Sequence, residues 1–315
     1  MSSLALKGPY WVTVRQHRRA LRVAAVAVAA ALVVVGGLRL WDAMVPDMVM
    51  EGGDKVPADD DHGYGLLRWG MEYFSVAMVL LPLLVGAFVA GPMVARELES
   101  GTYKLALNQS VAPSRWLGAK LLTAAGATAV IIAALMAVYQ VGLARVEGSL
   151  ELHWADRGAY EASGTTLLAQ CLLAIAVGAL VGQLVRRTVP AMAVTGIFVG
   201  LPILLLGAYR WDFLSVETIT GPINVSTGIL VAPGDGFMTD HGLLAADGGR
   251  ITDWPCWGNE DTYTCLARQG VTGQYLDYHP ASHFWPTQLI ETGIVLALAA
   301  LALLAAFRVL RARHP

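Results

Sequence analysis

RELESGTYKLALNQSVAPSRWLGAK, residues 96–120, is a charged and turn-containing stretch that separates two long apolar runs. The chain around it is unusually apolar, since 56% of its 315 residues are hydrophobic and only 15% are charged. Soluble domains carry about 25% charged residues. The composition therefore predicts an integral membrane protein, in which residues 96–120 form a loop at the membrane surface.

Six apolar runs are long enough to cross a membrane as helices, because a hydrocarbon core of about 30 Å takes roughly 20 helical residues. The runs lie at residues 21–40, 76–95, 117–138, 166–185, 189–208 and 289–307. We do not expect the first to be a cleavable signal peptide, since Arg39 and Trp41 follow it in place of small residues. The fold class predicted is an all-α integral membrane protein with six transmembrane helices.

Basic residues gather beside alternate ends of these runs, which predicts that both termini face the cytoplasm of a cell with this chain in its plasma membrane. These residues are Arg15, Arg18, Arg19, Arg22, Arg96, Lys104, Arg115, Lys120, Arg186, Arg187, Arg308, Arg311 and Arg313. In this topology Glu97 and Glu99 are the only two carboxylates on the cytoplasmic side.

The topology divides the chain into four parts. Residues 1–19 are expected to form a cytoplasmic interfacial helix, because Tyr10, Trp11 and Val14 share a helix face before the basic cluster. Residues 20–208 hold the first five transmembrane helices and the loop 96–120. Residues 209–287 form a large extracellular domain, and residues 288–315 hold the last helix and a basic cytoplasmic tail. A basic cluster beside a membrane helix sets topology, so no nucleic-acid partner is expected.

The first outer loop, residues 41–71, contains Asp59, Asp60, Asp61 and His62. This acidic run leaves open a cation site or a solvated surface turn. It lacks the alternating ligands and terminal glutamate of a calcium loop, so we favour the turn and expect no metal site.

Local signals divide the stretch around residues 96–120 further. Pro82 and Pro92 predict a bend in the second span, because proline removes a backbone donor. Gly101 is placed to end a helix, and Thr102 is placed to cap a short helix that would contain Leu105 and Leu107.

The order of residues here resembles the membrane subunits of ABC exporters of the ABC-2 class, which include the ABCG-like (type V) transporters and bacterial drug and antibiotic efflux permeases. The pattern is Arg-Glu-x-x-x-Gly-Thr, a short leucine-containing helix, and Ser-Arg-x-x-x-x-Lys at the head of the next span. The matching residues are Arg96, Glu97, Gly101, Thr102, Ser114, Arg115 and Lys120. The six spans and the long segment before the last one extend the resemblance over most of the chain.

The resemblance implies a permease whose loop 96–120 docks into a groove of a separate ATPase subunit, in a complex of two permease and two ATPase copies. Glu97, Tyr103, Arg115 and Lys120 are suited to anchor such a loop. A plainer interpretation makes Arg96 and Lys120 snorkelling residues at the membrane interface.

Signatures of catalysis are missing from the sequence. No Gly-x-x-x-x-Gly-Lys-Ser/Thr phosphate cradle occurs, nor the motifs of zinc or serine hydrolases. We therefore expect no enzyme and no cofactor on this chain, with ATP and Mg bound by the partner subunit.

Two features mark the outer part of the chain. Cys256 and Cys265 both fall in residues 209–287, on the oxidising side of the membrane, and are predicted to form a disulfide. Glu291 begins the last span. It is a candidate outer gate that pairs with His283 or Arg210, or else a carboxylate favoured by the helix dipole.

No other ionisable group is expected deep in the spans, which disfavours an ion-coupled carrier. The sequence thus favours an exporter permease for a hydrophobic or amphipathic compound. The alternative is a membrane sensor or scaffold that binds a ligand or protein through its extracellular domain. Dependence on an ATPase partner separates the two.

Overall fold

The computed structural model describes most of the chain. The described residues are 14–15, 17–44, 48–51, 54–57, 62–103, 112–146, 152–223, 229–252, 256 and 262–313. They form two compact units: the membrane unit, Met1–Leu152, Asp156–Tyr209 and Gln288–Pro315, and the sheet unit, His153–Ala155 and Arg210–Thr287. Tyr10 and Trp11 of the expected interfacial helix, and Asp59, Asp60 and Asp61, lie outside the described residues.

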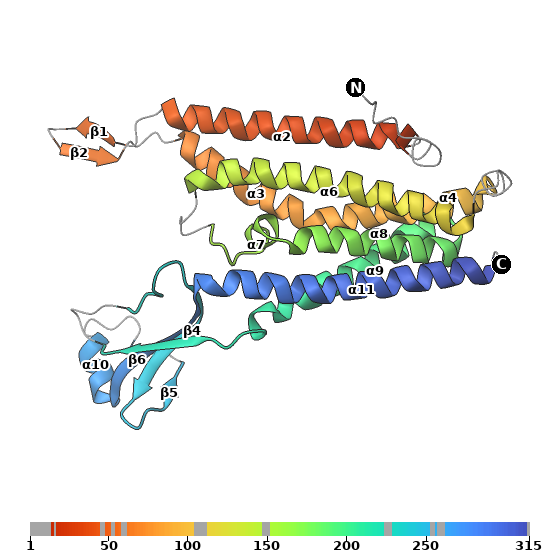
Figure 1. The fold of residues 1–315 in the computed structure, drawn as a ribbon. Helices are drawn as coiled ribbons and strands as arrows, with labels where there is room; N and C mark the ends of the chain where they lie inside the picture. The colour runs from red at the N-terminus through yellow and green to blue at the C-terminus, as the bar shows by residue number, and fades with distance from the viewer. Residues whose placement is uncertain are drawn as a thin grey trace. The chain divides into compact units, whose positions relative to one another are not determined.

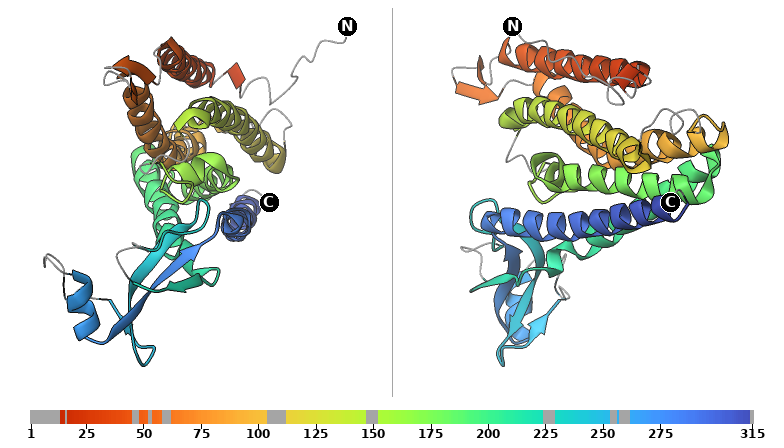
Figure 2. Two further views of the ribbon diagram at one scale, coloured as in Figure 1. Left: turned by 90° about the vertical axis from the view of Figure 1, so that its left-hand side faces the viewer. Right: turned by 45° about the vertical axis from the view of Figure 1, so that its right-hand side comes forward.

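Six helices of the described chain are long and apolar enough to cross a membrane, as predicted. They are α2 (Arg18–Met44), α3 (His62–Leu84) continued by η1 (Val85–Ala90) and α4 (Gly91–Glu99), α6 (Pro113–Val146), α8 (Thr166–Val185), α9 (Thr188–Tyr209) and α11 (Phe284–Arg313). Within the membrane unit they lie side by side, with α2 at the edge of the bundle (Figures 1 and 2).

Most of these helices are longer than predicted, which corrects the expected outer loop 41–71. That stretch contains the end of α2, a hairpin of β1 (Met48–Glu51) and β2 (Asp54–Pro57), and the first turns of α3. Hydropathy marks only the residues that match the hydrocarbon core, whereas helical hydrogen bonding continues into the interface.

Where Pro82 and Pro92 predict a bend, the structure has a π-helical segment between the two prolines. Pro82 lies inside α3 and Pro92 lies in the first turn of α4, with the six residues of η1 between them. The chain stays helical throughout this stretch, which neighbouring helices of a bundle allow around proline.

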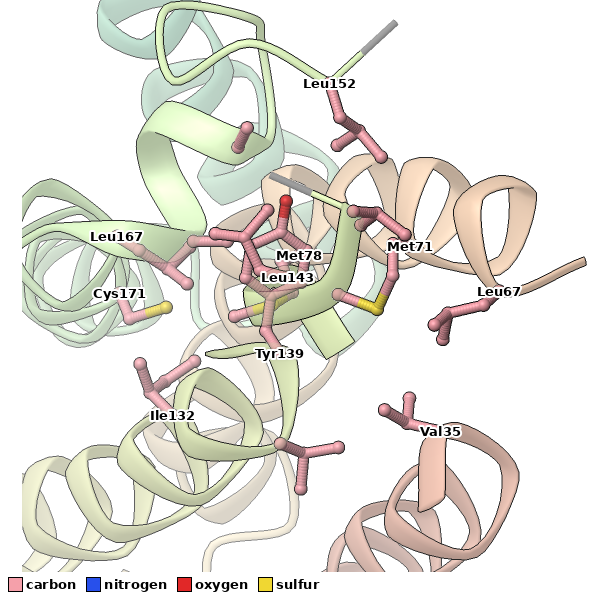
Figure 3. Packing of buried hydrophobic residues seen from close by; sticks show 14 residues of the cluster. Val35, Leu67, Met71, Met78, Ile132, Tyr139, Leu143, Leu152, Leu167 and Cys171 are labelled. Atoms are coloured by element: carbon pink, nitrogen blue, oxygen red, sulfur yellow. The ribbon is translucent and has the colours of Figure 1, made fainter. Parts of the chain in front are cut away.

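Four membrane-spanning helices and the short helix α7 (Ala159–Ser163) share one hydrophobic core (Figure 3). Met71 of α3 and Tyr139 of α6 are fully buried in it, with Val35 of α2 and Cys171 of α8. The Tyr139 ring meets the Phe74 ring edge to face at 5.8 Å. This core fixes α2, α3, α6 and α8 to one another over part of their length.

Glycines allow α8 to lie against η1 and α4 with their backbones in contact. A Cβ on Gly178 would overlap Ala90, and one on Gly182 would lie 3.0 Å from the amide nitrogen of Ala95. Small residues are the usual means of close helix approach in lipid. These two positions make α4 and α8 a closely packed pair.

The prediction of an all-α fold is wrong for the sheet unit. It contains an antiparallel sheet in the order β3-β6-β4-β5, together with the helix α10 (Thr262–Arg268). The strands are β3 (Glu217–Gly221), β4 (Phe237–Ala245), β5 (Arg250–Ile251) and β6 (Val271–His279). Ladders such as Ile219 opposite Leu276 join residues far apart in sequence, which no local pattern reveals.

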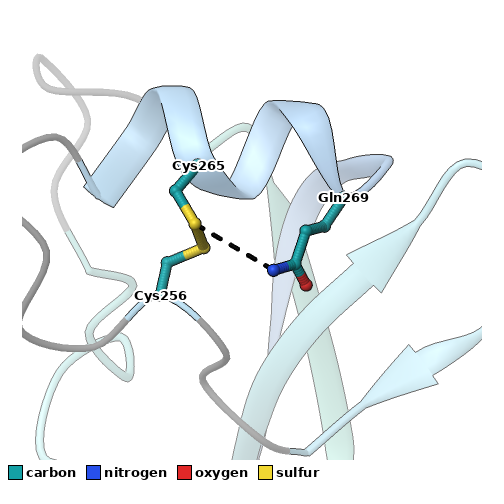
Figure 4. Close-up of a disulfide and its surroundings, with 3 residues drawn as sticks. All are labelled: Cys256, Cys265 and Gln269. Carbon is teal, nitrogen blue, oxygen red and sulfur yellow. Dashed lines mark hydrogen bonds between the residues drawn. A yellow bond between two sulfur atoms is a disulfide. The ribbon is translucent and has the colours of Figure 1, made fainter.

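The predicted disulfide between Cys256 and Cys265 is present in this unit, with a Cα–Cα distance of 5.9 Å (Figure 4). Cys256 is fully buried beside Leu243, Leu266 and Val271. The cross-link thus joins α10 to Cys256, which packs against the hydrophobic side of the sheet.

Candidate functional site

The site begins where α4 ends. Ser100 closes the helix by donating its backbone N–H to the carbonyl of Arg96 at 3.0 Å, and Gly101 follows with a φ of +73°. Glycine adopts this left-handed conformation without the steric cost of a side chain. Residues 104–111, with Leu105 and Leu107 of the expected short helix, lie outside the described part of the chain.

An ion pair closes the base of the coupling segment, the name used here for residues 96–120. Lys120 Nζ, on α6, lies 2.7 Å from Glu97 Oε1 on α4 and 3.5 Å from the carbonyl of Met93. It also lies 5.4 Å from the centroid of the Trp116 ring. Two of the residues singled out by sequence therefore meet, and they do so across the two ends of the segment.

Burial distinguishes this pair from an ordinary surface salt bridge. The Lys120 side chain is only 4% exposed and that of Glu97 19%, so Lys120 does not extend toward solvent. Lys120 lies near the start of α6, in the predicted span 117–138. A buried ammonium needs both an opposite charge and hydrogen-bond acceptors, and Glu97 and Met93 supply them.

The other coupling residues lie at the end of α4, just beyond it, or at the start of α6. Arg96, Thr102 and Arg115 are exposed, and Tyr103 is half-buried. Thr102 Oγ1 lies 2.9 Å from Ser100 Oγ beyond the helix end. The exposed side chains are available on the surface of the membrane unit.

Glu99 joins the coupling segment to α9. Its Oε2 accepts hydrogen bonds from the backbone N–H of Thr188 at 2.9 Å and from the Thr188 hydroxyl at 2.5 Å. The N–H groups of a first helical turn have no partner inside their helix, and a carboxylate there also complements the dipole. Sequence reasoning assigned Glu99 no partner, because a cap supplied by a distant helix leaves no local pattern.

His17 brings the start of the first span to the same end of the bundle. Burial lowers the pKa of His17, and the neighbouring charge of Lys120 lowers it further, against a smaller opposite effect of Glu97. Burial and the Lys120 charge thus disfavour the protonated form of the imidazole.

A pocket of about 270 Å³ lies beside the coupling segment, between the ends of α4, α8 and α11. Tyr103, Trp116, Arg186 and Arg313 line it, and Arg313 donates a hydrogen bond to the carbonyl of Gln183. One end of the membrane unit, called the basic end below, thus gathers His17, Lys120, Arg186 and Arg313.

Glu291 lies elsewhere in the membrane unit, in a buried polar cluster between α8 and α11. It is fully buried and accepts a hydrogen bond from Gln170 Nε2 at 3.3 Å. Nearby, Gln288 accepts from the Thr166 hydroxyl at 2.6 Å and donates to the carbonyl of Tyr160 at 2.7 Å. In the sequence, Thr166 and Gln170 are four residues apart, and Gln288 and Glu291 are three apart. Each pair therefore shares one face of its helix, which is the sequence signal that could have indicated this cluster.

His283, the partner proposed for Glu291 from sequence, belongs to the sheet unit. There its Nδ1 lies 3.0 Å from Nδ1 of His279. One ring must donate and the other accept at this distance, so the contact requires at least one of the two to be neutral. Burial, and next the charge of His283, lower the pKa of His279.

The described residues contain no group of three or more His, Cys, Asp or Glu side chains placed to hold a metal ion.

Comparison with known proteins agrees with the helical architecture. The family described as "ABC-2 membrane transporter related" matches residues 23–210, more than half of the chain, including the coupling segment and most of the first five spans. Neither the curated proteins nor the solved structures contain a match. With its six membrane-spanning helices and this match, the chain belongs to the ABC-2 membrane transporter related family.

Proposed function

We propose that this chain is the membrane subunit of an ATP-driven exporter, coupled through residues 96–120 to a separate subunit that binds ATP and Mg and hydrolyses the nucleotide. The family supports a permease that works with an ATPase. The sequence holds no phosphate cradle of its own. Two permease copies and two ATPase copies complete the proposed complex.

The Glu97–Lys120 ion pair is the observation that carries this proposal. A loop that transmits force needs a firm connection to its helices, and a charged hydrogen bond buried at its base supplies one. The pair ties the end of the second span to the start of the third, so a displacement of the loop moves both helices together.

The packing around α4 supports transmission beyond the loop. Gly182 lets α4 rest against α8 with Ala95 in contact, and the Glu99 carboxylate holds the first turn of α9. Closely packed elements move as units and do not deform continuously. Movement of the coupling segment is thereby passed to α8 and α9.

The orientation belongs to the same proposal. The basic end lies in the cytoplasm of the cell, with both termini, and the sheet unit lies outside. Basic residues favour the cytoplasmic side, and the Cys256–Cys265 disulfide is suited to an oxidising compartment. The apolar surfaces of the spans support a hydrophobic or amphipathic substrate moved outward.

Co-purification with a candidate ATPase subunit tests the proposal. Glu97→Gln keeps the shape of the side chain but removes the charge facing Lys120, and it should weaken association or ATPase stimulation. Asp42→Asn is the matched control, because it breaks a second membrane-unit ion pair, to Arg145 at 3.0 Å. Equal behaviour of the two variants would reject the coupling assignment. An ATPase-independent chain would favour the sensor or scaffold alternative.

A further inference from the structure

Along the first part of α2, the helix stands apart from its neighbours and leaves an apolar cleft. Two adjoining pockets of about 200 and 660 Å³ lie between α2 and α6, and the smaller one reaches η1. Both are lined by Leu21 of α2 and by Thr123, Ala127 and Ile131 of α6. We call these two pockets together the α2 cleft.

The opposite end of α2 is fastened to the bundle. Asp42 Oδ2 lies 3.0 Å from Arg145 Nε on α6, and a Cβ on Gly63 of α3 would come within 3.0 Å of the Asp42 backbone. Val35 is buried in the core it shares with Met71. The helix is thus held at one end and separated at the other.

The walls of the cleft are small and apolar. Ala24, Ala25, Gly126 and Ala127 face it where larger side chains would fill the space. Small residues normally allow two helices to touch, yet here they leave the volume open. In a bilayer such a volume is filled by hydrocarbon and not by water.

The ionisable side chains that line the cleft lie at one end of it. His17 and Lys120 line it there, and Lys120 is paired with Glu97. Arg18, Arg19 and Arg22 are exposed on the same first turns of α2. The cleft therefore combines an apolar body with an excess of positive charge at the basic end, which the proposed orientation places at the inner leaflet.

We propose that the α2 cleft binds an acyl chain of an anionic phospholipid from that leaflet, with its phosphate close to Arg18 and Arg22. A protein helix does not fit, because a cylinder about 10 Å wide occupies roughly 400 Å³ per turn. The larger pocket holds less than two such turns. The volume of the larger pocket falls within the range of about 300–1,000 Å³ that is typical of small-molecule sites.

Lipid binding in the α2 cleft rests on the proposed orientation but not on coupling to an ATPase. Failure of the lipid proposal would therefore leave the coupling proposal intact, and failure of the coupling proposal would leave the lipid proposal intact. The test places the full chain in nanodiscs of phosphatidylglycerol and phosphatidylcholine with a trace of phosphatidylglycerol that carries a photoreactive acyl chain. Peptide mass spectrometry then locates the adducts. Labelling should concentrate on residues 21–28 and 122–134, above its level on the lipid-facing residues 197–205 of α9.

Two matched variants sharpen the test. Gly126→Leu fills the cleft, and since nothing lies within 4 Å of a Cβ at this position the fold should tolerate it. Labelling at the cleft should fall to the level seen on α9. Gly37→Leu places the same side chain in equally open space on α2 outside the cleft, and it should change nothing.

Headgroup preference is tested by comparing this labelling with that from phosphatidylcholine that carries the same photoreactive acyl chain. Arg18→Gln and Arg22→Gln should each reduce the preference for the anionic probe about fivefold, the equivalent of about 1 kcal/mol per basic residue at an anionic surface. Uniform labelling of all lipid-facing helices would overturn the proposal. Unchanged labelling of the cleft in the Gly126→Leu variant would also overturn it. The absence of labelling in the cleft, because part of the chain fills it, would do the same.

Discussion

Glu97 accepts a 2.7 Å hydrogen bond from Lys120, a residue 23 positions later in the chain. Because Lys120 is almost fully buried, the contact lies under the coupling segment and not on its surface. The segment that the sequence marks as charged thus has a buried ion pair at its base.

Removal of the lysine charge should destabilise the protein. Lys120→Met leaves Glu97 facing a buried site without its partner, and loss of one member of a buried pair costs about 3–5 kcal/mol. We expect about 3 kcal/mol, since Glu97 retains 19% exposure. Denaturant unfolding of the purified protein in detergent measures the change.

The double variant Glu97→Gln, Lys120→Met is the control for that experiment. It removes both charges, so most of the lost stability should return. A single Lys120→Met variant that unfolds like the original protein would show that the ion pair contributes no stability.

The contact between Glu99 and Thr188 predicts a local effect. Glu99→Ala should remove the cap from α9, and amide exchange should rise in the first turn of that helix. Exchange in α8 should not change. Equal exchange in α9 of both proteins would contradict a capping role for Glu99.

Sequence reasoning identified the six spans because a run of about 20 apolar residues is a local signal. It identified Glu97 and Lys120 as important but did not pair them, since their contact depends on how α4 and α6 meet. The Glu99–Thr188 cap was missed for the same reason. Tertiary geometry decides both contacts.

The sheet unit shows a second limit of the sequence. Cys256 and Cys265 were paired correctly because they are nine residues apart and share a segment that the predicted topology places on the oxidising side. The strands around them were missed, because Val271–His279 pairs with two strands that lie up to about 60 residues earlier. Short strands with distant partners carry little local pattern.

Loss of the disulfide should loosen this unit. The double variant Cys256→Ser, Cys265→Ser opens a short loop, at a cost of about 2–3 kcal/mol on the loop-entropy estimate, and it places a hydroxyl in the buried cluster with Leu243. Thermolysin should cut the sheet unit faster. Cys171→Ser, at a buried free thiol of the membrane unit, should not accelerate this cleavage; an unchanged rate in the double variant would contradict the prediction.

The His279–His283 contact predicts sensitivity to acid in the sheet unit. Because the folded state lowers the pKa of His279 below its ordinary value of 6.5, folding favours the neutral ring. Its contribution is complete above pH 6.5 and is lost as the pH falls through the lower folded value. Unfolding measured from pH 7.5 to 5 should show stability falling with acid, and His279→Gln should reduce that slope. The same slope in the variant would contradict this origin.

Site-specific photocross-linking from Thr102 tests the coupling assignment most directly. Thr102 is exposed just beyond the end of α4, so a benzophenone amino acid there should form an adduct with the ATPase subunit in the assembled complex. The same group at Thr272, an exposed position of the sheet unit, should form none. An ATPase adduct from Thr272 and not from Thr102 would contradict the account, as would a complex in which neither position reacts with the ATPase.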